Sequence, residues 1–222
     1  MRSANVIIIS IEEKIVQMII LLRHGQADNN TKKILAGRTP GINLTEEGRE
    51  QAKQAGEMLK DLNISAIYSS PIDRAMQTAE IVGKQCGVEP MSDDRLIELD
   101  MGKFTMIPYE EIFEKHGNVF LKFYEGSLEI SHNGVESFSE VQKRIFEMVD
   151  FVKNKHKDEN VVLVTHMDPI KAVIGKILSL KPEILFQLII ANASLNIIKY
   201  DDQNFYLSSI NSMNSSRFHE TF

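Results

Sequence analysis

The residues Met18–Gly25, Met-Ile-Ile-Leu-Leu-Arg-His-Gly, decide the fold of this chain. Their first five residues are apolar without alternation, which predicts a strand covered on both faces, as in the parallel sheet of an α/β domain. Because ligands bind beyond the carboxyl ends of such strands, we expect Arg23 and His24 at the mouth of the sheet. There an imidazole can attack phosphorus beside a guanidinium that holds phosphate oxygens. Gly25 has no Cβ, so we expect a turn with room for an anion. Taken alone, such a tripeptide is more often a turn than a catalytic site.

The run Val161–Val164 repeats this pattern. It is purely apolar, and His166 follows at the predicted strand end. We expect Asp168 to cap a helix that continues to about Leu180, with Pro169 in its first turn. The alternative for His166 is a buried core histidine with satisfied hydrogen bonds, which would be the better interpretation if this residue stood alone.

A third strand, predicted at Ile64–Ser69, leads into a compact helix start. Ser70 suits the N-cap, Pro71 the first helical position and Asp73 the third, as in a capping box. Arg74 then falls in the first turn, where side chains lean toward the helix N-terminus. We therefore expect its guanidinium at the strand ends, the alternative being an ordinary surface arginine.

The rest of the chain predicts further elements of both kinds. In order these are a helix capped by Thr45, with Ala52, Ala55, Leu59 and Leu62 on its buried face; a short strand, Val88–Pro90; a turn around Glu98; helical pieces within Ile107–Ile130; a helix, Ser137–Lys155; and strands Leu195–Tyr200 and Phe205–Ile210, joined by the polar turn Asp201–Asn204. We expect one domain over residues 18–210, with a cap near 105–140. Met18 opens the first strand so directly that residues 1–17 are expected to be an upstream extension, and residues 211–222 a polar tail.

Composition limits the class of protein. The 222 residues, 43% hydrophobic and 25% charged, are typical of a globular protein with a normal core. A net charge of −6 argues against a general nucleic-acid binder, which needs a basic surface. Cys86 is the only cysteine, so we expect no disulfide within the chain and a reducing, cytoplasmic compartment. The apolar run Val6–Ile11 is too short to span a membrane and no cleavage site follows it, so we expect neither an anchor nor a signal peptide.

Motifs of several other chemistries are missing from the sequence. It has no Cys/His cluster with zinc spacing, no Walker-type glycine loop with lysine and no Gly-x-Ser-x-Gly elbow. Histidine with arginine remains, and this combination suits phosphoryl transfer without a metal, because cations stabilise the charge on the equatorial oxygens of the transferred group. We therefore expect no metal and no cofactor.

Four motifs in the right order resemble the histidine phosphatases, the phosphoglycerate mutase-like superfamily. The resemblance covers essentially Met18 to Ile210 and rests on these segments: Arg23-His24-Gly25 with Asn30; Leu35–Arg38 and Leu44–Ala52; Ser69–Ala79; Leu96–Gly102 around Glu98; and Val164–His166 with Asp168–Lys171. Three departures from the family pattern leave its charged catalytic groups in place. They are Ala27 for a threonine, Met167 for a glycine, and Phe104-Thr105-Met106 for Trp-Glu-Gly.

The resemblance implies an α/β fold, a three-layer α/β/α sandwich with a mostly parallel sheet and a small helical cap. It also implies a phosphomonoester hydrolase that acts through a phosphohistidine on a small phosphorylated metabolite. His24 would attack phosphorus, and Glu98 would protonate the leaving oxygen and then deprotonate water. The residues that would cradle the phosphoryl group are Arg23, Asn30, Arg74 and His166.

Two other functions stay open at this point. A 2,3-bisphosphoglycerate-dependent phosphoglycerate mutase shares all these residues and differs in how the phosphoenzyme is discharged. A non-catalytic phosphate-binding protein fits less well, since a binder would not need Glu98. The cap favours the hydrolase, because it is rich in glutamate and has no arginine between Arg95 and Arg144, whereas a mutase must also hold a second phosphate and a carboxylate. We expect no nucleic-acid or membrane partner, and a homodimer is left open.

Overall fold

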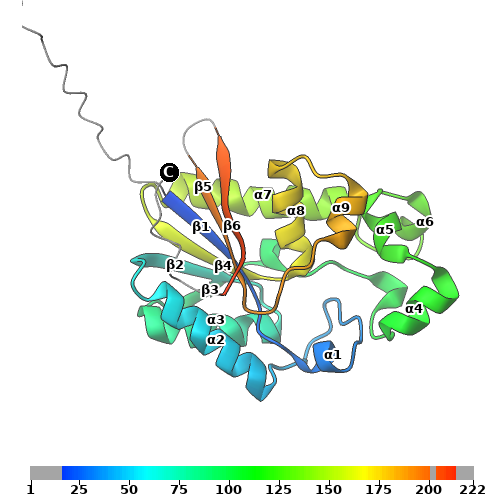
Figure 1. Ribbon diagram of the computed structural model, residues 1–222, viewed down its shortest axis with the longest axis horizontal. Helices are drawn as coiled ribbons and strands as arrows, with labels where there is room; N and C mark the ends of the chain where they lie inside the picture. Colours follow the sequence, from blue (N-terminus) through cyan, green and yellow to red (C-terminus); the bar gives the residue numbers. More distant parts are fainter. Residues whose placement is uncertain (1–16, 201–203, 214–222) are drawn as a thin grey trace, which may run out of the picture.

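The computed structural model describes residues 17–200 and 204–213 (Figure 1). The strands are β1 (Gln17–Arg23), β2 (Ile64–Ser69), β3 (Pro90–Ser92), β4 (Asn160–Thr165), β5 (Leu195–Tyr200) and β6 (Phe205–Ser212). The helices are α1 (Asp28–Thr31), α2 (Glu46–Leu59), α3 (Asp73–Cys86), α4 (Tyr109–His116), α5 (Val119–Tyr124), α6 (Leu128–Ser131), α7 (Phe138–Lys155), α8 (Met167–Ile177) and α9 (Pro182–Gln187), with short 3-10 helices η1 (Asp94–Leu96) and η2 (Gly102–Phe104). Almost all of the predicted N-terminal extension, most of the predicted tail and residues 201–203 of the polar turn lie outside the described residues.

The described strands form one six-stranded sheet in the order β3-β2-β4-β1-β5-β6. β3, β2, β4 and β1 run parallel, whereas β5 is antiparallel to β1 and β6 to β5. This confirms the prediction of a mostly parallel sheet. The register pairs Arg23 of β1 with Thr165 of β4. Because a histidine comes next on each strand, His24 and His166 leave the sheet side by side.

Helices cover both faces of the sheet and produce the predicted three layers. Ile20 and Leu22 of β1 pack in a core cluster with α2 and α3, whereas Ile19 and Leu21 pack in the opposite cluster with α7 and α8. Figure 1 shows α2 and α3 below the sheet and α7 and α8 above it. All four side chains are fully buried. The unbroken apolar run of β1 therefore follows from burial on both faces.

The cap consists of α4, α5 and α6 and lies at the right of Figure 1. It occupies residues 102–134, and its two ends meet. Met101 and Val135 form an antiparallel bridge, and the Glu136 N–H donates to the Asp100 carbonyl at 2.9 Å. The chain thus enters and leaves the cap at one place, and the cap is also bonded to residues 33–35 through the bridge between Ile34 and Pro108.

The capping box predicted at the start of α3 is wrong. The helix begins at Asp73, and Ile72, whose side chain cannot accept a hydrogen bond, stands at the N-cap. The Ser70 hydroxyl accepts from the Ile72 N–H at 3.3 Å, whereas Asp73 Oδ2 accepts from the Gly41 N–H at 2.6 Å. The carboxylate thus holds a loop 32 residues upstream instead of its own helix.

The predicted cap of α8 is wrong as well. The helix begins at Met167, His166 stands at its N-cap, and no side-chain capping bond forms there. Asp168 Oδ1 instead accepts from the Tyr124 hydroxyl of α5 at 2.5 Å. The helix ends at Ile177, three residues before the predicted end.

The start of α2 is confirmed and explains Gly25. The Thr45 hydroxyl accepts from the Gly48 N–H at 3.0 Å, as expected for an N-cap. A Cβ on Gly25 would lie 2.3 Å from the Gly48 carbonyl oxygen. Glycine is therefore required because the chain after β1 passes directly against the first turn of α2, and not to make room for an anion.

Strand boundaries differ slightly from the prediction. β3 is Pro90–Ser92 instead of Val88–Pro90, and β6 continues two residues past Ile210, to Ser212. The predicted strands Ile64–Ser69 and Leu195–Tyr200 are confirmed. The predicted helix Ser137–Lys155 is also confirmed, with Ser137 as its N-cap.

Candidate active site

His24 follows β1 directly, and its side chain is buried. Its Nδ1 lies 2.7 Å from the Gly25 carbonyl oxygen, which can only accept, so the ring hydrogen is on Nδ1 and Nε2 keeps a lone pair. Arg74 Nε donates to this Nε2 at 3.2 Å. Burial first, and then the charges of Arg74 and Arg23, lower the pKa of His24 well below 6.5. The imidazole is therefore held neutral, with its free nitrogen toward the guanidinium.

Two arginines reach the strand ends. Arg74, in the first turn of α3, leans toward the helix N-terminus as predicted and contacts His24. Its Nη2 donates to the Gly37 carbonyl at 2.8 Å, whereas its buried Nη1 has no partner among the described residues. Arg23 Nη1 donates to the Ile190 carbonyl, and its buried Nε likewise lacks a partner in the described chain. Buried donors are rarely left unpaired, so these two nitrogens are available to an acceptor that enters the pocket.

His166 packs edge-on against His24, with ring centroids 5.1 Å apart. Its Nε2 lies 2.9 Å from Ser70 Oγ. Its Nδ1 is buried, has no hydrogen-bond partner among the described residues, and lies 4.0 Å from Glu98 Oε2. Burial and the nearby Arg74 lower the pKa of His166 well below 6.5, so this contact is not an ion pair. One ring nitrogen is thus left for a ligand.

Asn30, in the short α1, is held by its own turn. Its Oδ1 accepts from the Ala27 N–H at 2.9 Å and from Asn192 Nδ2 at 3.4 Å. Asn192 also donates to the His24 carbonyl at 3.1 Å and so ties Asn30 to the strand end. With the oxygen of Asn30 engaged, its amide hydrogens remain for a ligand. Asn192 was not predicted, because a lone asparagine before β5 carries no motif.

Glu98 lies in the segment between η1 and η2, with a side chain only 14% exposed. Its Oε1 accepts from the Leu99 N–H at 2.8 Å. Burial, reinforced by the charge of Asp168, raises the pKa of Glu98 to about 7, against the opposing effects of Arg74 and Arg23. A carboxyl group with this pKa can both give and take a proton near neutrality.

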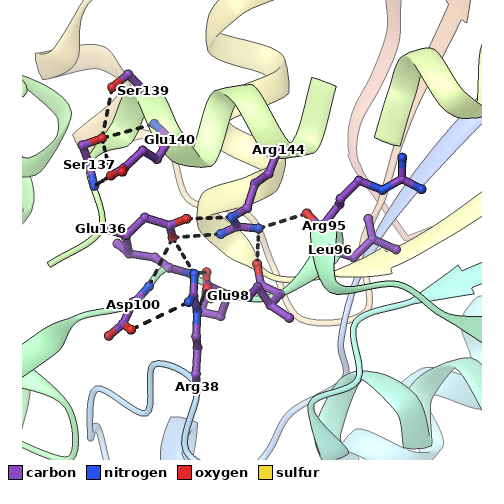
Figure 2. Close-up of polar contacts among 12 residues, drawn as sticks. Arg38, Arg95, Leu96, Glu98, Asp100, Glu136, Ser137, Ser139, Glu140 and Arg144 are labelled. Carbon is purple, nitrogen blue, oxygen red and sulfur yellow. Dashed lines mark hydrogen bonds and ion pairs between the residues drawn. The ribbon is translucent and has the colours of Figure 1, made fainter. Parts of the chain in front are cut away.

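Three charged residues hold the backbone around Glu98, and Figure 2 shows them as a connected network. We call Arg38, Glu136 and Arg144 the Arg–Glu–Arg clasp. Both arginines donate to the Glu136 carboxylate, each with a bond of 2.8 Å. Arg38 Nε also donates to the Glu98 carbonyl at 2.8 Å, and Arg144 Nη1 to the Ile97 carbonyl at 2.6 Å. Sequence reasoning gave no role to the clasp, because Arg38 lies 98 residues from Glu136 in the chain.

The predicted residues meet at one pocket. Arg23, His24, Asn30, Arg74 and Glu98 all line it. His166 is not a lining residue, although its ring contacts that of His24. The rest of the lining consists of Asn29, Leu35, Ala36, Gly37, Leu99, Met101, Tyr109, Phe120, Met167 and Asp168.

Five of the aromatic side chains in and near the cap fall into two groups. Phe104, Phe123 and Tyr124 are buried and belong to the main hydrophobic cluster. Tyr109 and Phe120 lie only partly buried against that cluster and line the pocket. Substrate contact is therefore open to the second pair.

Two kinds of feature are missing from residues 17–200 and 204–213. No group of three or more His, Cys, Asp or Glu there is placed to hold a metal ion. No helix there has the length and apolar character needed to cross a membrane.

Fold and pocket together define an α/β/α protein with paired histidines and two arginines at the carboxyl edge of a mostly parallel sheet. The model of one protein family matches residues 19–213 and identifies the family. The chain belongs to the histidine phosphatase superfamily (branch 1). This confirms the resemblance inferred from the motifs.

Relatives include both mutases and phosphatases. The 2,3-bisphosphoglycerate-dependent phosphoglycerate mutase of Thermoplasma acidophilum is 35% identical over 82% of this chain and 86% of that protein. Phosphoserine phosphatase 1 of Hydrogenobacter thermophilus is 28% identical over 87% and 91%. The structure of a mycobacterial glucosyl-3-phosphoglycerate phosphatase, 28% identical, matches with a TM-score of 0.79 over 88% of this chain and 99% of that one. A Bacillus anthracis phosphoglycerate mutase, 26% identical, matches at 0.77 over 89% and 94%, which confirms the predicted fold.

Proposed function

We propose that the protein is a phosphomonoester hydrolase that acts on a small phosphorylated metabolite through a phosphohistidine at His24. The observation that carries this proposal is the set of unpartnered buried nitrogens around His24: Arg23 Nε, Arg74 Nη1 and His166 Nδ1. Burying such groups without partners is unfavourable, and a phosphoryl dianion would supply acceptors for all three.

In the first half-reaction, the Nε2 lone pair of His24 forms a bond to phosphorus while the bond to the leaving oxygen breaks. Arg74 Nε, which donates to Nε2 in the free protein, transfers its hydrogen bond to a phosphoryl oxygen. With the Ser70 hydroxyl as the donor to His166 Nε2, His166 keeps a hydrogen on Nδ1, which would bond a second oxygen. Protonated Glu98 gives its proton to the leaving alcohol. The surrounding donors stabilise the charge that spreads over the transferred oxygens.

In the second half-reaction, the Glu98 carboxylate takes a proton from a water molecule. The water oxygen forms a bond to phosphorus, the phosphorus–nitrogen bond breaks, and His24 regains its lone pair. Phosphate leaves, with Glu98 protonated again. A pKa of about 7 suits a group that must act as acid and base in turn.

The pocket favours hydrolysis over isomerisation. Among the described residues no lysine or arginine lines it beyond Arg23 and Arg74, and its lining includes Tyr109, Phe120 and the carboxylate of Asp168. A mutase must keep a bisphosphorylated intermediate while excluding water, which needs cations for the second phosphate. The mutase remains the alternative because the relative from Thermoplasma acidophilum carries that name.

One assay separates these two activities. The protein is given 3-phosphoglycerate with and without 2,3-bisphosphoglycerate, while 2-phosphoglycerate and free phosphate are followed together. We expect little 2-phosphoglycerate, and free phosphate from a panel of phosphomonoesters. Efficient bisphosphoglycerate-dependent conversion with little release of phosphate would establish the mutase instead.

The reaction is also proposed to need no metal. Arg23, Arg74 and His166 would supply the positive charge and donors that a divalent cation supplies at many phosphoryl-transfer sites. Dialysis against a chelator should therefore leave turnover unchanged, with a magnesium-dependent phosphatase as the positive control for removal. Loss of activity that Mg²⁺ or Zn²⁺ restores would contradict this proposal.

We also propose a cytoplasmic location and a homodimer. The single, half-buried Cys86 supports a reducing compartment. The edge strand β6 supports the dimer, because edge strands present unpaired backbone groups to a second chain.

A further inference from the structure

One carboxylate at the pocket has no part in the proposed reaction. Asp168 lines the pocket and is 9% exposed. Its Oδ1 accepts from the Tyr124 hydroxyl, whereas no residue in the described part of the chain donates to Oδ2. The side chain caps no helix, and no described lysine or arginine forms an ion pair with it. Oδ2 is therefore left for a group that enters the pocket.

A buried lysine supports this carboxylate through a tyrosine. Lys171, 3% exposed, donates from Nζ to the Tyr124 hydroxyl at 3.1 Å and lies 5.0 Å from the centre of its ring. Lys171, Tyr124 and Asp168 thus form a continuous hydrogen-bonded chain that ends at the pocket, which we call the Lys–Tyr–Asp chain. The Tyr124 hydroxyl, itself held by Lys171, fixes the orientation of the Asp168 side chain.

For binding a phosphate alone, this carboxylate is unfavourable. The pocket would receive a dianion, and like charges repel more strongly where water is excluded. Asp168 does contribute to the raised pKa of Glu98, but burial is the larger cause. A carboxylate buried at the pocket is stabilised when the ligand brings a hydrogen-bond donor to it.

We propose that Asp168 determines specificity by accepting a hydrogen bond from a hydroxyl or ammonium group on the leaving group of the substrate. This inference rests on the proposed phosphoryl transfer at His24. The substrate class is then a phosphomonoester of an alcohol that carries a second hydroxyl or an amino group. Tyr109, Phe120 and Met167 line the same pocket and would contact the carbon skeleton. A carboxylate placed beside Asp168 is disfavoured by repulsion.

Three short esters test the proposal. Glycerol 3-phosphate offers hydroxyl donors, 2-aminoethyl phosphate offers an ammonium group, and propyl phosphate offers neither. Asp168→Asn keeps an oxygen for Tyr124 but replaces the free acceptor with an NH₂ group. We expect kcat/KM for at least one donor ester, relative to propyl phosphate, to fall about 10- to 100-fold, the usual effect of losing a hydrogen bond to a charged group.

The ratio of kcat/KM between two esters separates an effect on substrate recognition from an effect on the chemical step. All three esters have alkyl leaving groups that need a proton from Glu98, so a change in the pKa of Glu98 alters their rates in the same direction and largely cancels in the ratio. Whichever donor ester loses more identifies the hydroxyl or the ammonium as the natural partner. Asp150→Asn, a matched change at an exposed position of α7, should leave every ratio unchanged.

An equal change on all three esters would overturn the proposal, because Asp168 would then act only through Glu98. Should Asp168→Asn fail to fold, the wild-type protein decides the question. It should prefer one donor ester over propyl phosphate by about 10-fold or more, and the absence of any preference would overturn the proposal.

Binding measurements separate this inference from the proposed function. In a His24→Ala background, calorimetry gives the affinity for each ester without turnover. Adding Asp168→Asn should weaken binding of the preferred donor ester by about 10-fold or more and leave that of propyl phosphate nearly unchanged. This contrast does not depend on whether the wild-type protein hydrolyses or isomerises its substrate, which the phosphoglycerate assay decides.

Discussion

The His24→Ala variant is expected to lose hydrolytic activity by roughly 10⁴-fold or more while it keeps the fold. The change removes Nε2, the atom that would attack phosphorus. The His24 ring contacts Arg74 and His166 at the end of β1 and is not part of the hydrophobic clusters, so far-UV circular dichroism should remain that of the wild type. Initial rates on a phosphomonoester measure the loss. A matched change at the exposed His132 should have no effect on the rate.

Chemical trapping gives a second readout for the same variant. A phosphorus–nitrogen bond hydrolyses in acid and survives in base, so protein quenched with labelled substrate should carry acid-labile, base-stable label. The label should be present in the wild type and His132→Ala, and absent from His24→Ala. An adduct that is stable in acid and labile in base would indicate a carboxylate nucleophile and contradict the assignment.

The second large effect is expected at Glu98 and depends on the leaving group. Glu98→Gln should slow hydrolysis of an alkyl phosphate by about 10²–10⁴-fold, the usual contribution of general acid–base catalysis. Hydrolysis of nitrophenyl phosphate should fall much less, because its leaving group scarcely needs a proton. Equal losses on both substrates would mean that Glu98 only supports the structure or binds substrate.

The pH profile of the wild type provides a further check on Glu98. Burial raises the pKa of this carboxyl group to about 7, so the acid form is present below that pH and is lost above it. kcat/KM for the alkyl phosphate should therefore fall as pH rises through about 7, and Glu98→Gln should lack this limb. His24 must be neutral to attack, and its pKa is lowered well below 6.5, so its own limb lies at lower pH. A profile that is flat above pH 7 in the wild type would contradict the role of Glu98.

Local sequence patterns predicted the fold well because its main elements follow local rules. The apolar run of β1 is covered on both faces, and Thr45 caps α2 by accepting a hydrogen bond from the N–H of Gly48, three residues further along the chain. The position of Arg74 was also predictable, since the direction of a side chain in a first helical turn depends only on the helix. Strand ends brought His24 and His166 together because parallel strands share one carboxyl edge.

Other features depended on contacts between distant residues and could not be predicted. Asp73 and Asp168 are both good capping residues, yet one holds Gly41 and the other Tyr124, 44 residues upstream. The Arg–Glu–Arg clasp joins Arg38 to a carboxylate 98 residues away. A local sequence pattern indicates which nearby backbone groups a side chain can bond. It gives no information on hydrogen-bond partners that the tertiary fold brings close from distant parts of the chain.

The meeting of the cap ends at Met101 and Val135 has a consequence for how such a protein can change its substrate. Because these two residues are adjacent in space, the segment between them can be replaced by one of another length without changing the distance between its ends. Each doubling of the segment's length costs only about 0.6 kcal/mol in loop-closure entropy. Tyr109 and Phe120 belong to this segment, whereas His24 and Glu98 lie outside it. Grafting a different insertion at this junction would therefore exchange the recognition surface and leave the reacting groups in place.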